Sequence, residues 1–186
     1  FFSPVDKMKL VEIIRGQDTD DETIARAYDY VQALGKLPIV VNDSRGFYTS
    51  RTFGTFVMEG AAMLGEGIPA PVIENAAMQA DMPVGPLAVL DETALSLSVH
   101  VLEQTRIDFQ KDGQQYVTTP GETLVEEMVK RHNRPGRAAG GGFYDYPEGG
   151  KKHLWPHLKT LYEKPGVAWD LQDVKDRLLY RQAIET

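Results

Sequence analysis

The chain has 186 residues, of which 42% are hydrophobic and 25% charged, and its formal net charge is −7. The negative charge argues against nucleic acid as a partner, since phosphates are bound by lysine and arginine, and the absence of cysteine excludes disulfides, thiolate nucleophiles and cysteine metal sites. The length suffices for one domain, or for one domain and part of another, and no apolar run approaches the ~20 residues of a membrane-spanning helix.

The beginning of the chain predicts a strand, a helix and a second strand. Residues 8–14 alternate in the manner of a strand. A helix follows, with a capping box formed by Thr19 and Glu22 at its start and Gly35 as its C-terminal cap. Residues 37–41, "LPIVV", form the second strand. Strands joined by a helix at this spacing are parallel, and the whole piece is typical of the end of a larger α/β domain.

Helical patterns dominate the rest of the chain. Apolar residues recur at helical spacing in four segments: 53–64, 71–80, 87–109 and 170–186. Within the third of these, the predicted apolar face consists of Leu87, Leu90, Ala94, Leu97 and Val101. Thr119, Pro120 and Glu122 predict the start of a further helix. Gly60, on the apolar face of the first segment, would let another helix approach closely. We therefore expect a mainly α chain that continues beyond both of its ends.

Glu12 is the strongest candidate for chemistry. It lies between Leu10 and Ile14 on one face of the predicted strand, where a carboxylate is costly to bury unless a partner compensates its charge. A carboxylate in such a place can orient a catalytic base, most often a histidine. The alternative is a glutamate at an edge or end of a strand that faces water. The sequence pattern leaves both interpretations open.

Two other patterns give weaker signals. His153 and His157 have the i, i+4 spacing of metal ligands on a helix, but Pro156 interrupts the segment and no third ligand accompanies them. We therefore expect solvated histidines and no metal site. The glycines at 140–142 do not fit the dinucleotide-binding pattern G-x-G-x-x-G, and no strand leads directly through them into a helix. A flexible hairpin or turn is expected there.

The segment "FFSPVDKMKLVEIIRG" resembles the 3-hydroxyacyl-CoA dehydrogenase family, whose pattern is H-F-F-N-P…M-x-L-V-E-[IV]-I. Agreement continues through "TIARAYDYVQALGKLPIVVNDSRGF", "MPVGPLAVLD" and "GRAAGGGFYDY". The resemblance implies that residues 1–45 are the last β-α-β piece of a Rossmann-type NAD-binding domain. It implies that residues 46–165 form the family's helical C-terminal domain. Residues 166–186 would begin a second copy of that helical domain, as in the multifunctional β-oxidation enzymes.

The resemblance implies a dehydrogenase that oxidises 3-hydroxyacyl-CoA to 3-ketoacyl-CoA with NAD in fatty-acid β-oxidation. The family's catalytic histidine falls immediately before Phe1, and its glutamate partner falls on Glu12, which would hold the imidazole in the correct tautomer. The third polar residue of the family's site, an asparagine, is replaced by Ser50, and a usual proline by Arg45. Serine offers one hydroxyl instead of an amide. NAD would bind mostly to the domain before this chain, so we expect no NAD turnover by residues 1–186 alone.

The resemblance also implies an acyl-CoA substrate, a homodimer or a β-oxidation complex, and a place in the cytoplasm of a bacterium or in a mitochondrion or peroxisome of a eukaryote. Ser50 motivates an alternative, a non-catalytic packing or dimerisation module whose contacts use Phe53, Phe56 and Leu64. A further alternative is a dehydrogenase for another hydroxy acid, such as a sugar acid, against which the F-F-x-P…L-V-E match argues.

Overall fold

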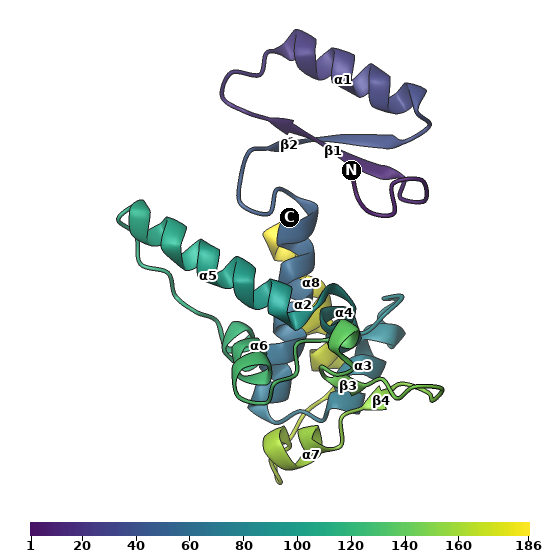
Figure 1. The fold of residues 1–186 in the computed structure, drawn as a ribbon, viewed down its shortest axis with the longest axis vertical. Helices are drawn as coiled ribbons and strands as arrows, with labels where there is room; N and C mark the ends of the chain where they lie inside the picture. Colours follow the sequence, from purple (N-terminus) through teal and green to yellow (C-terminus); the bar gives the residue numbers. More distant parts are fainter. The chain divides into compact units, whose positions relative to one another are not determined.

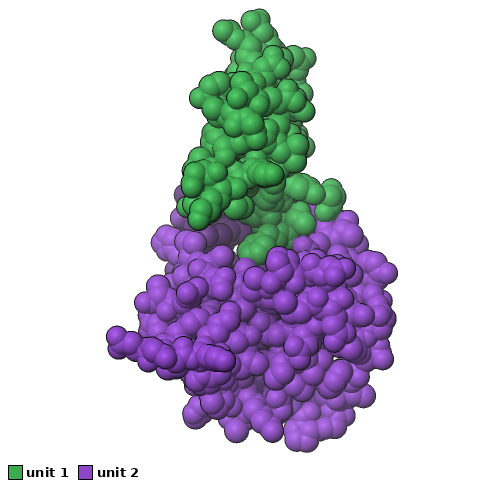
Figure 2. All heavy atoms as spheres, turned by 90° about the vertical axis from the view of Figure 1, so that its right-hand side faces the viewer, with its two compact units in different colours: residues 1–53, 186 green, residues 54–185 purple.

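The computed structural model describes residues 1–186 as two compact units, residues 1–53 with Thr186 and residues 54–185 (Figures 1 and 2). In chain order, the elements are β1 Leu10–Arg15, α1 Asp21–Ala33, β2 Leu37–Asn42, α2 Thr49–Glu66, α3 Ala70–Gln79, α4 Pro86–Thr93, α5 Leu95–Lys111, α6 Pro120–Lys130, the short 3-10 helix η1 Arg137–Ala139, β3 Tyr144–Asp145, β4 His153–Leu154, α7 His157–Tyr162 and α8 Leu171–Glu185. The mainly α fold with one β-α-β piece is as predicted. None of the helices has the length and apolar character needed to cross a membrane.

The first unit is the predicted β-α-β piece. β1 and β2 pair in parallel, with Glu12 opposite Ile39, and α1 packs on one face of the two strands (Figure 1). On that face Val11 and Ile13 of β1 are buried together with Val31 of α1. Glu12 lies on the other face, since successive side chains of a strand point to opposite sides.

The predicted capping box of α1 is wrong. Asp20, and not Thr19, is the N-cap, and its Oδ1 accepts a hydrogen bond from Thr23 N at 2.7 Å. Thr19 Oγ1 instead accepts from Gly16 N at 3.1 Å in the turn after β1. The sequence "DTDD" offers capping residues at four successive positions, which intrinsic preference does not separate. At the other end of the helix, Gly35 has a φ of 69°, as expected for a glycine that ends a helix.

The second unit surrounds one apolar core. Its largest fully buried side chains are Phe143, Met63, Leu64, Ile73, Leu87, Leu90, Leu95, Met128 and Leu178. A Cβ at Gly60 would lie 2.4 Å from Pro86 Cγ, so the close approach predicted at Gly60 is made by the start of α4. Phe56 and Leu64 are buried in the same core. The dimer interface suggested for these two side chains is therefore wrong.

The single helix predicted over 87–109 is wrong as well. The chain forms α4 and α5, which are separated by Ala94 with a φ of 69°. The break rotates the second part of the segment, so that Leu95 is buried whereas Leu97 and Val101 are 55% and 57% exposed. Neither proline nor glycine marks the break, and the apolar periodicity therefore runs through it in the sequence.

The C-terminal helix α8 completes the core of the second unit. Leu178 is fully buried, and Arg177 donates to Glu59 Oε1 at 2.7 Å and to Glu66 Oε1 at 2.8 Å, both on α2. The helix itself is thus present as predicted. Its assignment to a second copy of the helical domain, with residues 166–186, stays a prediction.

An ion-pair network joins α5 to α6. Arg106 donates from Nη1 and Nη2 to the two carboxylate oxygens of Glu126, each at 2.8 Å, and Lys130 donates to Glu126 Oε1 at 3.0 Å. The hydrogen bonds from Arg106 lower the pKa of Glu126 from its ordinary value of 4.5 to about 2. Because the pKa is lowered in the folded state, the stabilisation by this carboxylate is present above pH 4.5 and is lost as the pH falls toward 2.

We expect Glu126→Gln to lower the Tm at neutral pH by about 2–4 °C, since a pair at the surface contributes about 1 kcal/mol. The difference from the wild type should shrink between pH 4.5 and pH 2, where the wild-type carboxylate becomes protonated. Thermal unfolding followed by circular dichroism at a series of pH values measures it. Glu148→Gln, at an exposed site between β3 and β4, is the control. A Tm difference for Glu126→Gln that is independent of pH would contradict this interpretation.

Candidate functional site

Glu12 is the centre of the candidate site. Its Oε1 accepts hydrogen bonds from Tyr48 N at 3.1 Å, from Thr49 N at 2.8 Å and from Thr49 Oγ1 at 3.0 Å. All three of these bonds are made to Oε1, and the side chain is half-buried. These three donors fix one of the two carboxylate oxygens.

The turn after β2 brings these donors to Glu12. Phe47 N donates to Ser44 O at 2.9 Å, and Gly46 and Phe47 have φ values of 74° and 49°. Glycine adopts such a left-handed conformation without steric cost, which explains its presence in "SRGF". The chain thereby turns from β2 into α2 beside the neighbouring strand β1. The first residues of α2 reach the carboxylate for this reason.

The Glu12 carboxylate compensates the amino end of α2. The first N–H groups of a helix have no acceptor within the helix, and this end carries a partial positive charge. The first turn of α2 contains no acidic residue of its own, so that its anion comes from β1. Glu12 does not simply face water, and the charge in an otherwise apolar strand has a partner.

Ser50 is the second residue of α2 and is exposed. It directly follows Thr49, whose N–H and hydroxyl both bind Glu12. The structure thus places the two predicted site residues at the same end of α2. Arg45, the other departure from the family pattern, lies exposed in the preceding turn.

The two histidines with metal-ligand spacing make other contacts. His153 Nε2 lies 3.6 Å from Asp145 Oδ2, and the ring of His157 stacks on that of Trp155 with the centroids 5.1 Å apart. Across residues 1–186, no group of three or more histidine, aspartate or glutamate side chains is arranged to hold a metal ion.

The glycine-rich loop is fastened by a buried carboxylate that the sequence analysis missed. Asp91 Oδ1 accepts from Phe143 N at 2.7 Å, and its Oδ2 accepts from Tyr144 N at 2.8 Å. A Cβ at Gly142 would lie 1.9 Å from Asp91 Oδ1, so glycine is needed here for the carboxylate to reach the backbone. Asp91 is the last residue of the segment "MPVGPLAVLD", and Phe143 lies in "GRAAGGGFYDY". This contact therefore joins two of the segments that were singled out in the sequence.

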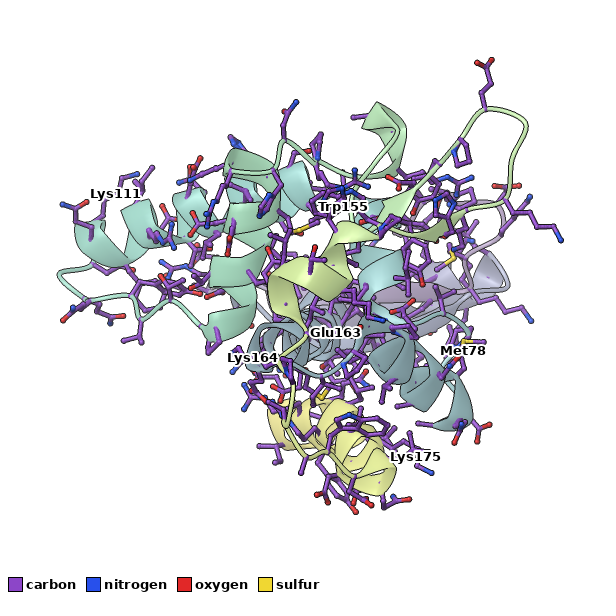
Figure 3. The ribbon with its side chains drawn as sticks, turned by 90° about the horizontal axis from the view of Figure 1, so that it is seen from below. Met78, Lys111, Trp155, Glu163, Lys164 and Lys175 are labelled. Carbon is purple, nitrogen blue, oxygen red and sulfur yellow. The ribbon has the colours of Figure 1, made fainter.

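Arg134 holds the other side of the loop. It donates to the backbone carbonyls of Gly142 and Tyr144 and to Asp145 Oδ1. Its guanidinium carbon lies 4.3 Å from the ring centroid of Trp155. Trp155, which is labelled in Figure 3, directly follows β4. The glycines at 140–142 therefore form the expected turn, which is tightly bound and lies before β3, whereas the hairpin of β3 and β4 lies after them.

Glu74 is a second buried carboxylate beside this loop. Its Oε1 accepts from Leu87 N at 2.8 Å and its Oε2 from the Tyr144 hydroxyl at 2.5 Å. Glu74 is 9% exposed and Asp91 is 1% exposed, and burial raises the pKa of both carboxyl groups. Raised pKa values of this kind often mark catalytic groups. Here every carboxylate oxygen is bonded to a backbone N–H or a tyrosine, which indicates a structural role. The sequence signal for Asp91 is its place at the end of the apolar run "PLAVL".

No segment of the chain forms a dinucleotide-binding loop. The glycines at 140–142 are packed against Asp91 and Arg134, and the N–H donors at the start of α2 are taken by Glu12. The connections after β1 and β2, "GQDTD" and "DSRGFY", do not match G-x-G-x-x-G.

Residues 46–146 match the family model described as "3-hydroxyacyl-CoA dehydrogenase, C-terminal domain", and residues 1–44 match "3-hydroxyacyl-CoA dehydrogenase, NAD binding domain". The chain belongs to the 3-hydroxyacyl-CoA dehydrogenase family. The two matches meet in the turn between β2 and α2, so the contact of Glu12 with Thr49 joins a residue of one match to a residue of the other.

Individual relatives agree with this family. The chain is 34% identical along its whole length to the fatty acid oxidation complex subunit alpha of Shewanella halifaxensis, and 36% identical over 83% of its length to that of Vibrio cholerae. It spans 25% and 21% of the length of these two subunits. The crystal structure of (S)-3-hydroxybutyryl-CoA dehydrogenase from Ralstonia eutropha matches with a TM-score of 0.66 and 35% identity, over 79% of this chain and 50% of that one.

Proposed function

We propose that this chain is part of an enzyme that oxidises 3-hydroxyacyl-CoA to 3-ketoacyl-CoA in fatty-acid β-oxidation, with NAD as the hydride acceptor. The proposal concerns a full-length protein, meaning residues 1–186 preceded by the rest of the NAD-binding domain, with the family's histidine directly before Phe1. The observation that carries it is the Glu12 carboxylate in an apolar strand, which three donors hold through Oε1. The names of the relatives support the same reaction.

In the proposed reaction, the histidine before Phe1 takes the proton of the substrate 3-hydroxyl, and NAD accepts the hydride from the same carbon. Glu12 Oε2 accepts a hydrogen bond from the second imidazole nitrogen, which fixes the tautomer and stabilises the imidazolium that forms. The three donors on Oε1 hold the carboxylate in place before the reaction begins. Glu12 thus acts by orienting the base.

Ser50 is proposed to donate one hydrogen bond to the substrate where the family has an asparagine. We expect Ser50→Ala to lower kcat/KM of the full-length protein about tenfold, which corresponds to one lost hydrogen bond. Ser50→Asn should restore or raise it, because the amide reaches further. Steady-state kinetics measures both variants, with Ser96→Ala on the exposed part of α5 as the control. An unchanged kcat/KM for Ser50→Ala would exclude the contact.

The partners of the full-length protein belong to this proposal too. They are the acyl-CoA substrate and either a second copy or another subunit of a β-oxidation complex, as the names of the relatives suggest. The bacterial origin of these relatives favours the cytoplasm as its location. Light scattering after size exclusion gives the oligomeric state, and a monomer at high concentration would argue against the homodimer.

The decisive assay is NADH formation by the full-length protein with a medium-chain 3-hydroxyacyl-CoA, followed at the nicotinamide absorbance. We expect turnover by the full-length protein and none by residues 1–186, which contain neither a pyrophosphate loop nor the histidine. A folded full-length protein without turnover would favour the non-catalytic packing module. NADH formation by residues 1–186 would contradict the assignment of cofactor binding to the preceding domain.

A further inference from the structure

One of the three donors on Glu12 depends on the identity of a side chain. The N–H groups of Tyr48 and Thr49 are backbone donors that almost any residue would supply. The third donor is the Thr49 hydroxyl, 3.0 Å from the same carboxylate oxygen. Threonine at the start of a helix commonly bonds to a nearby backbone group of its own helix. Here the hydroxyl binds a residue of β1, 37 positions earlier in the chain.

We propose that Thr49 is a positioning residue that fixes the orientation of the Glu12 carboxylate. The inference rests on the proposed function of Glu12 as the partner of the base. The terminal torsion of a glutamate side chain has broad energy wells, so the hydrogen bonds to its oxygens decide how the carboxylate is turned. Thr49 contributes a side-chain donor in addition to its backbone donor. Together with Tyr48 N, these donors occupy Oε1 and keep Oε2 for the imidazole.

Threonine suits this task better than serine. Its branched Cβ restricts the first side-chain torsion, so that the backbone of α2 largely determines where the hydroxyl points. Thr49 is half-buried, which limits competition by water for its hydroxyl. A serine retains the donor with more rotational freedom, and a valine retains the shape without the donor. Comparing threonine, serine and valine at position 49 therefore distinguishes the effect of the hydrogen bond from the effect of side-chain packing.

The test uses Thr49→Val and Thr49→Ser in the full-length protein. We expect Thr49→Val to lower kcat about tenfold with KM for 3-hydroxyacyl-CoA unchanged, because an orientation needed for proton transfer is lost and substrate binding is not. Thr49→Ser should stay within about threefold of the wild-type kcat. Thr123→Val, which removes an exposed hydroxyl bonded to Thr119 O on α6, is the matched control. If valine disturbs folding, Thr49→Ala provides a second hydroxyl-free variant.

A double-mutant cycle with Glu12→Gln completes the test. Since Thr49 acts through Glu12, Thr49→Val should change kcat less than about twofold in the Glu12→Gln background. An unchanged kcat for Thr49→Val, an equal loss in Thr49→Ser, or full additivity with Glu12→Gln would each overturn the inference. A wild type without turnover would instead refute the proposed function. A kcat that falls in Glu12→Gln but not in Thr49→Val would refute only the inference about Thr49 and leave the proposed function in place.

Discussion

Glu12→Gln lowers kcat of the full-length protein by about two to three orders of magnitude, if the carboxylate orients the base. Glutamine has one oxygen and one amide nitrogen in place of two equivalent oxygens. If its oxygen keeps the donors from Tyr48 and Thr49, the amide NH2 takes the place of Oε2 and meets the imidazole as a donor, which selects the wrong tautomer. If the amide is rotated by 180°, its NH2 lies against the N–H groups of Tyr48 and Thr49 and against the Thr49 hydroxyl, which are all donors. Neither orientation of the amide therefore accepts hydrogen bonds both from the donors of Tyr48 and Thr49 and from the imidazole.

The measurement is kcat at saturating NAD and acyl-CoA, with circular dichroism to show that the variant is folded. Glu22→Gln is a suitable control, because Glu22 is an exposed residue in the first turn of α1, with Arg26 Nη1 3.8 Å from its Oε1. It should leave kcat unchanged. A folded Glu12→Gln protein with a kcat within about threefold of the wild type would show that the carboxylate only caps α2.

Asp91→Asn is expected to give the largest loss of stability, about 3 kcal/mol in the free energy of unfolding. In the wild type, each carboxylate oxygen accepts from a backbone N–H, of Phe143 or of Tyr144. An asparagine places its NH2 against one of these donors and leaves that N–H without an acceptor in the buried site. The glycine-rich loop is packed directly against Asp91 at Gly142, so it cannot shift to relieve the unfavourable contact with the asparagine NH2.

Urea unfolding of the variant measures this effect as a lower midpoint with an unchanged slope of the free energy against urea concentration. The neighbouring Glu92 is the matched control. It is 38% exposed and lies 3.6 Å from Lys152 Nζ and 3.9 Å from Arg137 Nη1. Glu92→Gln should cost about 0.5 kcal/mol or less. Equal losses in the two variants would mean that the burial of Asp91 does not determine its contribution.

The features that sequence predicted well are encoded locally. The capping box of α6 is present, with Thr119 Oγ1 accepting from Glu122 N at 3.3 Å and Thr119 N donating to Glu122 Oε2 at 2.7 Å. Both partners lie within one helical turn. The break between α4 and α5 depends on a residue far away in the sequence, Gly136, which packs against it. A Cβ added at Gly136 would lie 3.0 Å from Asp91 O and 3.1 Å from Ala94 Cα.

In the candidate site, too, features that depend on neighbouring residues could be predicted, and contacts between distant residues could not. Glu12 stood out in the sequence because a carboxylate in an apolar strand is costly to bury without a partner, although the pattern also allowed a glutamate that faces water. The partner at Thr49 was not, since 37 residues separate the two and only the turn after β2 brings them together. Asp91 was missed for the same reason, since its acceptor role depends on Phe143, 52 residues away. Periodicity reports which face of an element is apolar, but not which distant polar group will meet a charge on it.

The most direct test of the proposed reaction follows the hydrogen that is transferred. The full-length protein would be incubated with NAD and a 3-hydroxyacyl-CoA carrying deuterium at C3, and the products analysed by mass spectrometry. We predict deuterium in the reduced nicotinamide, in equal amount to the 3-ketoacyl-CoA formed, and strongly slowed label transfer in Glu12→Gln. Unlabelled NADH, or no reduced nicotinamide from a folded protein that binds the acyl-CoA, would contradict the assignment of this chain to a hydride-transferring enzyme.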